Sequence, residues 1–325
     1  MKLIRISKFG GPEELQLTDA PIPVPGPQEA LIKVAAVGVN FIDVYFRIGL
    51  YKADLPLTPG NEASGVVQAV GAEVTSVKPG DRVAYAMHRG AYAEYTVVPA
   101  ASLVTLPANV DFKTGAAAML QGMTAHYLTH STFPLKRGDK ALVHAAAGGA
   151  GRLIVQMAKM LGATVYGTAG TDAKAAIAKQ AGADEVIVYT REDFVAEVKR
   201  FTDGKGVDVV YDSVGASTFM KGLDVLRPRG LMALFGQSSG PVPPFDLNIL
   251  NGKGSLFVTR PSLGHHCATR DELLWRSGDV LRWIGEGRLE LRIEKTYPLG
   301  DAAQAHRDLE GRGTAGKLLL IPGAG

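Results

Sequence analysis

The stretch Ala141-Leu-Val-His-Ala-Ala-Ala-Gly-Gly-Ala-Gly151 decides the fold that this chain is expected to adopt. Residues 140–147 are typical of a strand, the glycines of a turn, and residues 152–161 of a helix. Ala146, Gly148 and Gly151 occupy the three positions of the GxGxxG pattern, with alanine in the first. Such a turn presents backbone N–H groups at a helix N-terminus, where a phosphate binds favourably. The stretch predicts a dinucleotide site; the alternative is an ordinary tight turn between a strand and a helix.

The composition bounds the class of protein. The chain has 325 residues, 46% of them hydrophobic, which suggests about two domains with a sizeable core. Its 35 basic and 32 acidic residues leave a net charge of +3, which argues against a nucleic-acid partner. We expect no membrane association, because no apolar run approaches a membrane span and no signal-peptide core is present. The single cysteine, Cys267, excludes an intrachain disulfide and a cysteine-rich zinc site, and makes the cytoplasm the default location.

The pattern of expected strands and helices changes near residue 123. Before it, short strand-like runs are separated by Gly and Pro, at residues 2–7, 30–39, 63–70, 82–86 and 92–98. This spacing predicts a small barrel-like β domain. After it, strand candidates at 140–147, 164–168, 185–189, 207–212 and 231–235 alternate with helix candidates at 116–128, 151–161, 172–181, 191–201 and 217–226. Strands separated by helices predict a parallel, doubly wound sheet, so the fold class is α/β.

Longer motifs extend along the whole chain. They are Gly38-Val-Asn-Phe-Ile-Asp43, Pro59-Gly-Asn-Glu-Ala-Ser-Gly65, Gln121-Gly-Met-Thr-Ala-His-Tyr-Leu128, Tyr211-Asp-Ser-Val-Gly215, Phe235-Gly-Gln-Ser-Ser-Gly240 and Val258-Thr-Arg-Pro-Ser-Leu263. With these motifs the chain resembles the zinc-free, ζ-crystallin-like quinone oxidoreductases of the medium-chain dehydrogenase/reductase superfamily. The resemblance implies a GroES-like β-barrel catalytic domain, residues 1–121 and 262–325, and a Rossmann domain that binds NADP(H), residues 122–261.

The resemblance also bears on metal chemistry. Zinc-dependent relatives bind a catalytic metal through a cysteine and a histidine, and the matching positions here are Asn40 and Asn61. We therefore expect no metal site. Without a metal to polarise an alcohol, the chemistry favours an electron-poor acceptor such as a quinone or an α,β-unsaturated carbonyl.

Three residues are predicted to be catalytic. By resemblance, Asn40 is expected to donate its amide to the reacting oxygen or to the nicotinamide ribose, unless it only satisfies a turn. Tyr45 is expected near the nicotinamide, where it would donate a hydrogen bond or relay a proton, or else is a structural tyrosine. Tyr51 is expected at the substrate mouth, or else is also a structural tyrosine. We expect Asp43 and Glu62 to be unperturbed carboxylates in structural hydrogen bonds.

The end of the second Rossmann strand bears on the choice of cofactor. An NAD site has an acidic residue there, yet the strand ends Tyr166-Gly-Thr-Ala-Gly-Thr171, followed by Lys174. In the family this lysine and Tyr189 surround the 2′-phosphate, so NADPH is the expected cofactor. Asp172 is interpreted as the N-cap of the next helix, although it is also placed to serve NAD.

The remaining residues expected to bind the cofactor come from the strand ends and from elsewhere in the chain. Lys317 is expected near the cofactor phosphates, or else is a surface lysine on a strand. His144 is expected to be a packed histidine with its hydrogen bonds satisfied. The other expected cofactor contacts are Thr124, Ala147, Gly148, Gly149, Ala150, Gly151, Thr168, Ser213, Phe235, Gly236 and Ser238.

Together these features predict an NADPH-dependent quinone reductase. The alternatives are an NADPH-dependent alkenal or enoyl reductase and a non-catalytic NADPH-binding protein. The family also implies a homodimer formed through the apolar strand at residues 255–259.

Overall fold

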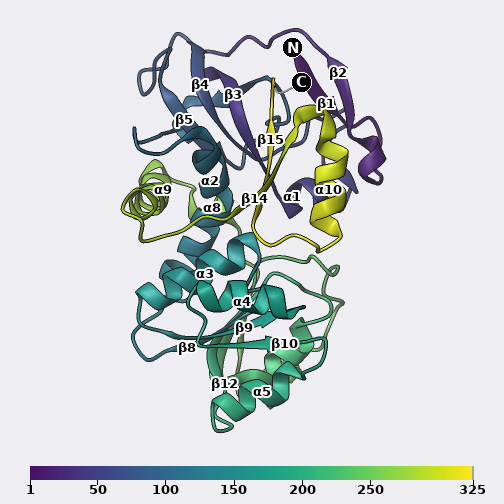
Figure 1. Ribbon diagram of the computed structural model, residues 1–325, viewed down its shortest axis with the longest axis vertical. Helices are drawn as coiled ribbons and strands as arrows, with labels where there is room; N and C mark the ends of the chain where they lie inside the picture. The colour runs from purple at the N-terminus through teal and green to yellow at the C-terminus, as the bar shows by residue number, and fades with distance from the viewer. Residues whose placement is uncertain (324–325) are drawn as a thin grey trace. The chain divides into compact units, whose positions relative to one another are not determined.

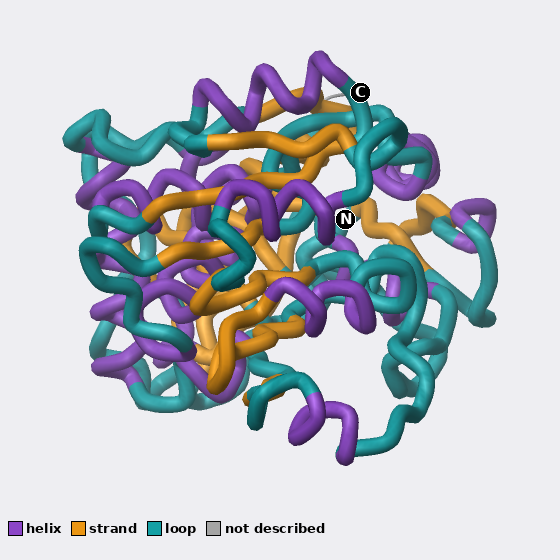
Figure 2. The backbone as a smooth tube through the Cα atoms, turned by 90° about the horizontal axis from the view of Figure 1, so that it is seen from below, coloured by secondary structure: helices purple, strands orange, loops and turns teal. Residues whose placement is uncertain are grey.

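The computed structural model describes residues 1–323. The chain divides into two compact units (Figure 1). Unit 1 comprises Met1–Met123 and the chain from His266 onward, and unit 2 comprises Thr124–His265. The sequence-based expectation placed the boundaries after residues 121 and 261. Figure 2 shows the backbone with helices in purple, strands in orange and loops in teal.

Unit 1 is built on a seven-stranded sheet whose longest strand, β3 (Glu29–Val39), pairs with three neighbours. The strand order is β14 (Ile293–Pro298), β15 (Lys317–Ile321), β3, β4 (Glu62–Val70), β5 (Arg82–Ala86) and β7 (Val104–Thr105), with β6 (Tyr95–Pro99) on β3. A separate two-stranded sheet contains β1 (Lys2–Arg5) and β2 (Gln16–Asp19). The C-terminal β15 therefore completes the N-terminal sheet, which confirms the GroES-like β domain.

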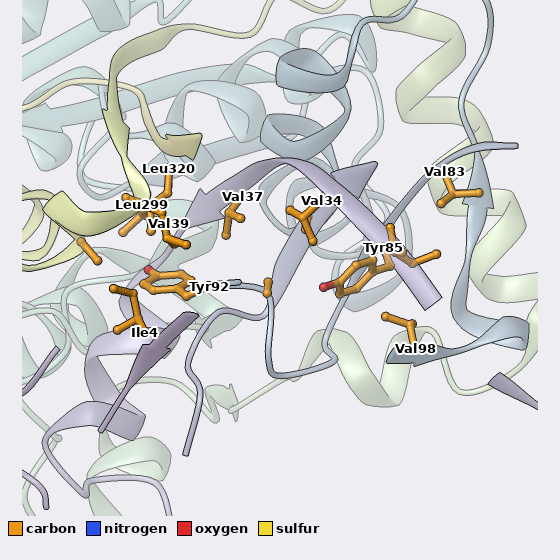
Figure 3. Packing of buried hydrophobic residues seen from close by; sticks show 14 of the residues in the cluster. Ile4, Val34, Val37, Val39, Val83, Tyr85, Tyr92, Val98, Leu299 and Leu320 are labelled. Atoms are coloured by element: carbon orange, nitrogen blue, oxygen red, sulfur yellow. The ribbon is translucent and has the colours of Figure 1, made fainter. Parts of the chain in front are cut away.

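An apolar cluster fills the interior of unit 1. Figure 3 shows Tyr92 beside Ile4 and Val39, and Tyr85 beside Val98. These side chains come from the strands and from the loop before β6, and all five are buried. Burial of this apolar surface is the main term that stabilises the unit.

Helices and helical turns connect these strands. The α-helices of unit 1 are α1 (Phe41–Arg47), α9 (Arg270–Gly285) and α10 (Ala302–Glu310), while α2 (Phe112–Tyr127) and α8 (Leu263–His266) cross the unit boundaries. The 3-10 turns are η1 (Pro12–Glu14), η2 (Ala100–Ser102) and η5 (Leu299–Asp301). Thr269 and Glu272 form a capping box that fixes the start of α9.

Unit 2 is a six-stranded, wholly parallel sheet. Its order is β10 (Glu185–Val188), β9 (Thr164–Ala169), β8 (Lys140–Val143), β11 (Val207–Asp212), β12 (Leu226–Leu234) and β13 (Phe257–Thr259). In chain order this is 3-2-1-4-5-6, the order of a doubly wound Rossmann sheet, so that prediction is confirmed. The order reverses between β8 and β11, and ligands of such sheets bind outside the carboxyl ends of the strands at this point.

Helices cover both faces of this sheet. In Figure 1, α3 (Gly149–Met160) and α4 (Asp172–Gln180) lie on one face and α5 (Phe194–Phe201) lies on the other. The shorter elements are η3 (Leu128–Thr132), α6 (Phe219–Gly222), η4 (Leu223–Val225) and α7 (Asn248–Gly252). No helix within residues 1–323 has the length and apolar character needed to cross a membrane.

Two predicted helices in unit 2 differ from the structure. The expected helix at 217–226 is only α6 followed by the turn η4, because β12 already begins at Leu226. The expected helix at 191–201 begins at Phe194, because Asp193 Oδ1 accepts the backbone N–H groups of Val195 and Ala196 and so caps α5.

Candidate active site

The glycine turn joins β8 to α3 at the carboxyl edge of the parallel sheet. Ala145 adopts φ 52°, and Gly148 precedes the helix with φ −70°. The left-handed residue of the turn is therefore an alanine and not one of the glycines. A Cβ at Gly151 would overlap the Ala145 carbonyl oxygen, so only glycine fits where α3 passes over the turn. A Cβ at Gly148 would lie 3.1 Å from the same oxygen, which is a milder constraint.

The side chain of Thr168 holds this turn from the neighbouring strand. Thr168 Oγ1 lies 3.0 Å from His144 Nδ1 and accepts the N–H of Ala145 at 3.3 Å. His144 is buried and burial lowers its pKa, but its Nε2 has no partner within residues 1–323. The expectation of a fully satisfied histidine therefore holds for one ring nitrogen only.

The turn between β9 and α4 brings together the residues expected at the 2′-phosphate. Thr171, not Asp172, caps α4, since its hydroxyl accepts the N–H of Lys174 at 3.3 Å. Asp172 is instead the first residue of the helix, and both of its oxygens accept from Arg191, at 2.6 and 2.8 Å. The Asp172 prediction was wrong because a threonine at the preceding position makes the cap.

Tyr189 closes the same turn from the end of β10. Its N–H donates to Ala169 O at 3.1 Å, and a Cβ on Gly170 would lie 2.8 Å from its hydroxyl oxygen. The tyrosine hydroxyl thus lies over the turn that leads to Lys174. The turn thus has the Tyr189 hydroxyl, the Lys174 ammonium and an Asp172 carboxylate whose charge Arg191 compensates. Such a group of side chains fits a phosphate monoester better than a ribose diol.

The ends of β11 and β12 bring four further expected residues together. Ser238 donates its N–H to Ser213 O at 3.2 Å, and Phe235 donates to Asp212 O at 2.8 Å. A Cβ on Gly236 would lie 2.6 Å from Ser213 O, so the two strand ends touch through the glycine. Thr124 is buried on α2. Ser213, Phe235, Gly236, Ser238 and the glycine turn therefore lie at the carboxyl ends of the parallel strands, where doubly wound sheets bind dinucleotides, and we call this group the strand-end cradle.

In unit 1, Asn40 belongs to a buried ion-pair network. Its Oδ1 accepts from Lys317 Nζ at 2.7 Å, and its Nδ2 donates to Glu62 Oε2 at 2.9 Å and to Gly38 O at 3.1 Å. Lys317 also forms an ion pair with Glu62, and both side chains are at most 2% exposed. The idea that Lys317 is a surface lysine was wrong, because Glu62 supplies the counter-charge that makes its burial tolerable. Both amide hydrogens of Asn40 are used within this network.

Asp43 is the centre of a second buried network. Its Oδ1 accepts from Asn61 Nδ2 at 2.7 Å, and its Oδ2 accepts from the Asn40 N–H at 2.9 Å and the Tyr92 hydroxyl at 3.3 Å. Burial raises the pKa of Asp43 to about 6, against the lowering effect of the hydrogen bonds from Asn61 and Asn40. The expectation of structural hydrogen bonds is confirmed for Asp43, and the expectation of an unperturbed carboxylate was wrong.

From Asp43 a chain of hydrogen bonds leads towards solvent. Tyr92 Oη lies 2.9 Å from His306 Nε2, and Arg47 Nη1 lies 2.9 Å from His306 Nδ1. Arg47 is always a donor, so Nδ1 accepts, Nε2–H donates to Tyr92, and the Tyr92 hydroxyl donates to Asp43. Burial lowers the pKa of His306 to about 3 and keeps it neutral. Arg47 ends the chain in a two-pronged ion pair with Glu310, at 2.8 Å for each contact.

The two predicted catalytic tyrosines lie together. The rings of Tyr45 and Tyr51 meet edge to face with centroids 5.3 Å apart, and the Tyr51 N–H donates to Tyr45 O at 3.1 Å. Tyr45 is buried on α1, and Tyr51 follows the helix and also packs on Phe46. The structure brings them together, and their catalytic roles stay predictions.

A pocket of about 500 Å³ opens beside α1. Its lining residues are Ile42, Phe46, Lys52, Asn61, Met87, His88 and Arg89. Sequence reasoning did not single out Lys52, His88 or Arg89. The signal that could have pointed to them is their position, because His88 and Arg89 follow strand β5 closely and Lys52 follows the predicted site residue Tyr51. Met87 adopts φ 68°, an uncommon conformation for a residue with a side chain, and its N–H donates to Asn61 O at 2.7 Å.

No metal-binding cluster of three or more His, Cys, Asp or Glu side chains occurs within residues 1–323. At the two positions where zinc-dependent relatives have ligands, Asn40 and Asn61 present amide groups that are bound to carboxylates. Amides engaged in this way are poor ligands for zinc.

Both units match models of known protein families. Residues 26–108 match the model of the alcohol dehydrogenase GroES-like domain, and residues 149–267 match the model named zinc-binding dehydrogenase. A quinone oxidoreductase of Pseudomonas aeruginosa is 45% identical over 323 residues, 99% of each chain. The crystal structure of Escherichia coli quinone oxidoreductase complexed with NADPH superposes with a TM-score of 0.97 at 45% identity, covering 99% of this chain and 100% of that one. A 2-haloacrylate reductase of a Burkholderia species is 42% identical over 327 residues, 98% of each chain.

Proposed function

Since the chain belongs to the quinone oxidoreductases of the medium-chain dehydrogenase/reductase superfamily, we propose that it is an NADPH-dependent quinone reductase that works without zinc. The observation that carries the proposal is the end-to-end identity of 45% to proteins named quinone oxidoreductase, one of them solved with NADPH. The turn between β9 and α4 supports the choice of cofactor, because Arg191 compensates the charge of Asp172 and the Tyr189 hydroxyl lies over the turn that leads to Lys174.

NADPH, when bound, supplies the hydride for the reduction. The glycine turn, with Ala147, Gly149 and Ala150 around Gly148 and Gly151, would bind the pyrophosphate through its backbone N–H groups. Lys174 and Tyr189 would bind the 2′-phosphate. Thr168, Ser213, Phe235, Gly236 and Ser238 would line the rest of the cradle, and Thr124, Asn40 and Lys317 are the further proposed contacts.

The acceptor requires hydrogen-bond donors rather than a metal, because reduction of a quinone places negative charge on a conjugated oxygen. Asn61 supplies one such donor. One Nδ2 hydrogen is held by Asp43, and the other has no partner within the described chain at a position that lines the pocket. Tyr45 and Tyr51, on and beside α1, are proposed to donate further hydrogen bonds or a proton to the acceptor. Asn40 would reach the acceptor only by exchanging its bond to Glu62 or Gly38.

A second candidate is an α,β-unsaturated carbonyl reductase. The relative named 2-haloacrylate reductase, at 42% identity over nearly the whole of both chains, favours it. Hydride addition to such an alkene also produces a delocalised anion that hydrogen-bond donors stabilise.

The test is an assay of NADPH oxidation with 1,2-naphthoquinone, benzoquinone and a set of alkenals. The proposal expects turnover with the quinones that survives dialysis against a strong chelator. Turnover with alkenals alone would support the second candidate, and no turnover with any acceptor would support a non-catalytic NADPH-binding protein. Stoichiometric zinc with chelator-sensitive activity would contradict the metal-free mechanism.

We also propose that the protein works as a homodimer in the cytoplasm. The dimer is supported by the exposed edge strand β13, and a reducing compartment is compatible with the single half-buried cysteine, Cys267. Cell fractionation with antibody detection tests the location, and light scattering tests the dimer.

A further inference from the structure

The charged residues that line the pocket of unit 1 are all positive. Of its lining residues, Lys52 and Arg89 are cationic and none is acidic. Neither cation has a carboxylate within 4.0 Å in the part of the chain that the structure describes. Elsewhere on the surface some exposed basic residues are in ion pairs, such as Arg191 with Asp172, and others, such as Lys33 and Lys113, have no carboxylate within 4.0 Å among the described residues. Lys52 and Arg89 differ from these because both line one pocket. Two uncompensated cations at one pocket raise the local concentration of anions.

Local contacts hold these groups at the pocket wall. The Arg89 guanidinium carbon lies 5.0 Å from the centroid of the Phe46 ring, a cation–π contact that restricts it to the wall. His88 Nε2 is 2.6 Å from Ser102 Oγ, which orients the imidazole, and burial lowers its pKa so that it stays neutral. The backbone bond from Met87 to Asn61 ties the segment that contains His88 and Arg89 to the start of β4.

The rest of the pocket suits a flat conjugated ring. Ile42, Phe46 and Met87 give it apolar surface, and Asn61 gives it one amide whose orientation Asp43 fixes. A ligand with an apolar ring and a negatively charged substituent would meet a complementary partner for each part.

We propose that this pocket selects acceptors that carry an anionic substituent, a carboxylate or a sulfonate, which Lys52 and Arg89 bind. The inference rests on the proposed function, since it names the class of acceptor for the same active site. Arginine binds such planar anions with two parallel hydrogen bonds, and lysine adds a point charge. The two contacts together are worth on the order of tenfold in binding, because exposed pairs contribute less than buried ones.

The test uses a matched pair of acceptors, 1,2-naphthoquinone and 1,2-naphthoquinone-4-sulfonate, at saturating NADPH. The sulfonate also changes the intrinsic reactivity of the ring. The readout is therefore the kcat/KM for the sulfonate divided by the kcat/KM for 1,2-naphthoquinone, compared between wild type and variants. In the double variant Lys52→Gln, Arg89→Gln this ratio should fall about tenfold through KM, and added salt should lower it in the wild type but not in the variant. Lys78→Gln, an exposed lysine of unit 1 outside the pocket, is the control that should keep the wild-type ratio.

A binding measurement separates this inference from the proposed function. Calorimetry with 1-naphthalenesulfonate, which cannot be reduced, should show binding that the double variant weakens about tenfold and Lys78→Gln leaves intact. If neither quinone is reduced but this binding is found, the proposed function fails and the pocket stands. If both quinones are reduced with the same ratio in every variant, the function stands and the inference is overturned. A rise in KM for NADPH with an unchanged acceptor ratio would also overturn it, since the cations would then serve the cofactor phosphates.

Discussion

At the scale of single residues, the buried network of unit 1 contains two groups whose pKa values are shifted in opposite senses. Burial raises the pKa of Asp43 to about 6, from about 3.9 in an unfolded chain. Burial lowers the pKa of His306 to about 3, from about 6.5 when unfolded. Tyr92 joins the two groups directly. Relative to the unfolded chain, folding therefore favours the protonated form of Asp43 and the neutral form of His306, which lie on either side of one tyrosine hydroxyl.

These shifts predict opposing effects of pH on stability between pH 4 and 6. There the folded state holds one more proton than the unfolded state at Asp43, so this group makes stability fall as pH rises. The folded state holds one proton fewer at His306, so that group makes stability rise with pH. Each effect amounts to about 1.4 kcal/mol per pH unit, and in the wild type the two largely cancel.

Two variants separate the effects. Over pH 4 to 6, the free energy of unfolding of His306→Gln should fall with rising pH, and that of Asp43→Asn should rise. Both replacements keep a group that can hydrogen-bond to Tyr92. The difference between the two slopes, measured by urea denaturation, should approach about 2.7 kcal/mol per pH unit, because other titrating groups contribute equally to both proteins. Parallel slopes for the two variants would contradict the assignment of these shifts.

Lys174 is predicted to determine the preference for NADPH. It follows Thr171, the cap of α4, and the Tyr189 hydroxyl lies over the same turn at Gly170, while Arg191 forms an ion pair with Asp172. A charge-assisted bond to a 2′-phosphate contributes roughly 1.5–3 kcal/mol, on the order of tenfold to a hundredfold in affinity. Lys174→Ala should therefore weaken NADPH binding by about that factor and leave NADH binding nearly unchanged, with little effect on kcat.

Fluorescence titration with both cofactors checks this prediction. Lys179→Ala is the matched control, because Lys179 lies at the other end of α4 and pairs with Glu185. An equal loss for both cofactors would show that Lys174 is structural. A wild type that prefers NADH would show that Asp172 leaves Arg191 to bind the ribose.

At the scale of elements, the turn between β8 and α3 tolerates only a glycine at one position. A Cβ at Gly151 would meet backbone atoms of Ala145 and Ala146, which cannot move aside as a flexible side chain does. Gly151→Ala should therefore lower the free energy of unfolding by about 1–3 kcal/mol and weaken NADPH binding. Gly278→Ala provides the control: Gly278 is exposed inside α9 with open space around it, so alanine should stabilise the protein by about 0.5–1 kcal/mol. Thermal unfolding and NADPH titration test both variants, and a Gly151→Ala protein as stable as the wild type would refute the argument.

The elements differ in how far the sequence predicts them. The alternation of strands and helices after residue 123 predicts the parallel sheet, because its signals are local and its crossovers have one handedness. The cap at Thr171 was missed because two adjacent residues, Thr171 and Asp172, are both good caps, and only the backbone shows which one accepts. The network of Arg47 and His306 joins residues 259 positions apart, so no local pattern reveals it. The cationic pocket was missed for the same reason, since Lys52 and Arg89 meet only when β4 and β5 pair.

At the scale of the whole molecule, the parallel sheet of unit 2 ends in an edge strand, β13, that has the backbone groups to pair with a further strand. Within residues 1–323, β13 pairs with β12 alone, so its outer edge presents unpaired N–H and C=O groups. Phe257 on this strand is 60% exposed. An exposed apolar edge strand promotes aggregation unless it is covered. A second copy related by a two-fold axis would cover it with the same strand and extend the sheet.

A charge at this edge should therefore prevent dimer formation. Phe257→Lys places an ammonium on each copy of the strand β13 in the proposed strand pair, where two like charges repel and lose hydration. The wild type should have twice the mass of one chain by light scattering, and the variant should be monomeric or should precipitate. Leu274→Lys is the matched control, because Leu274 is a comparably exposed apolar residue on α9, where the helix leaves no backbone edge to pair. A monomeric wild type would refute the dimer, and a Phe257→Lys protein that stays dimeric would place the interface on another surface.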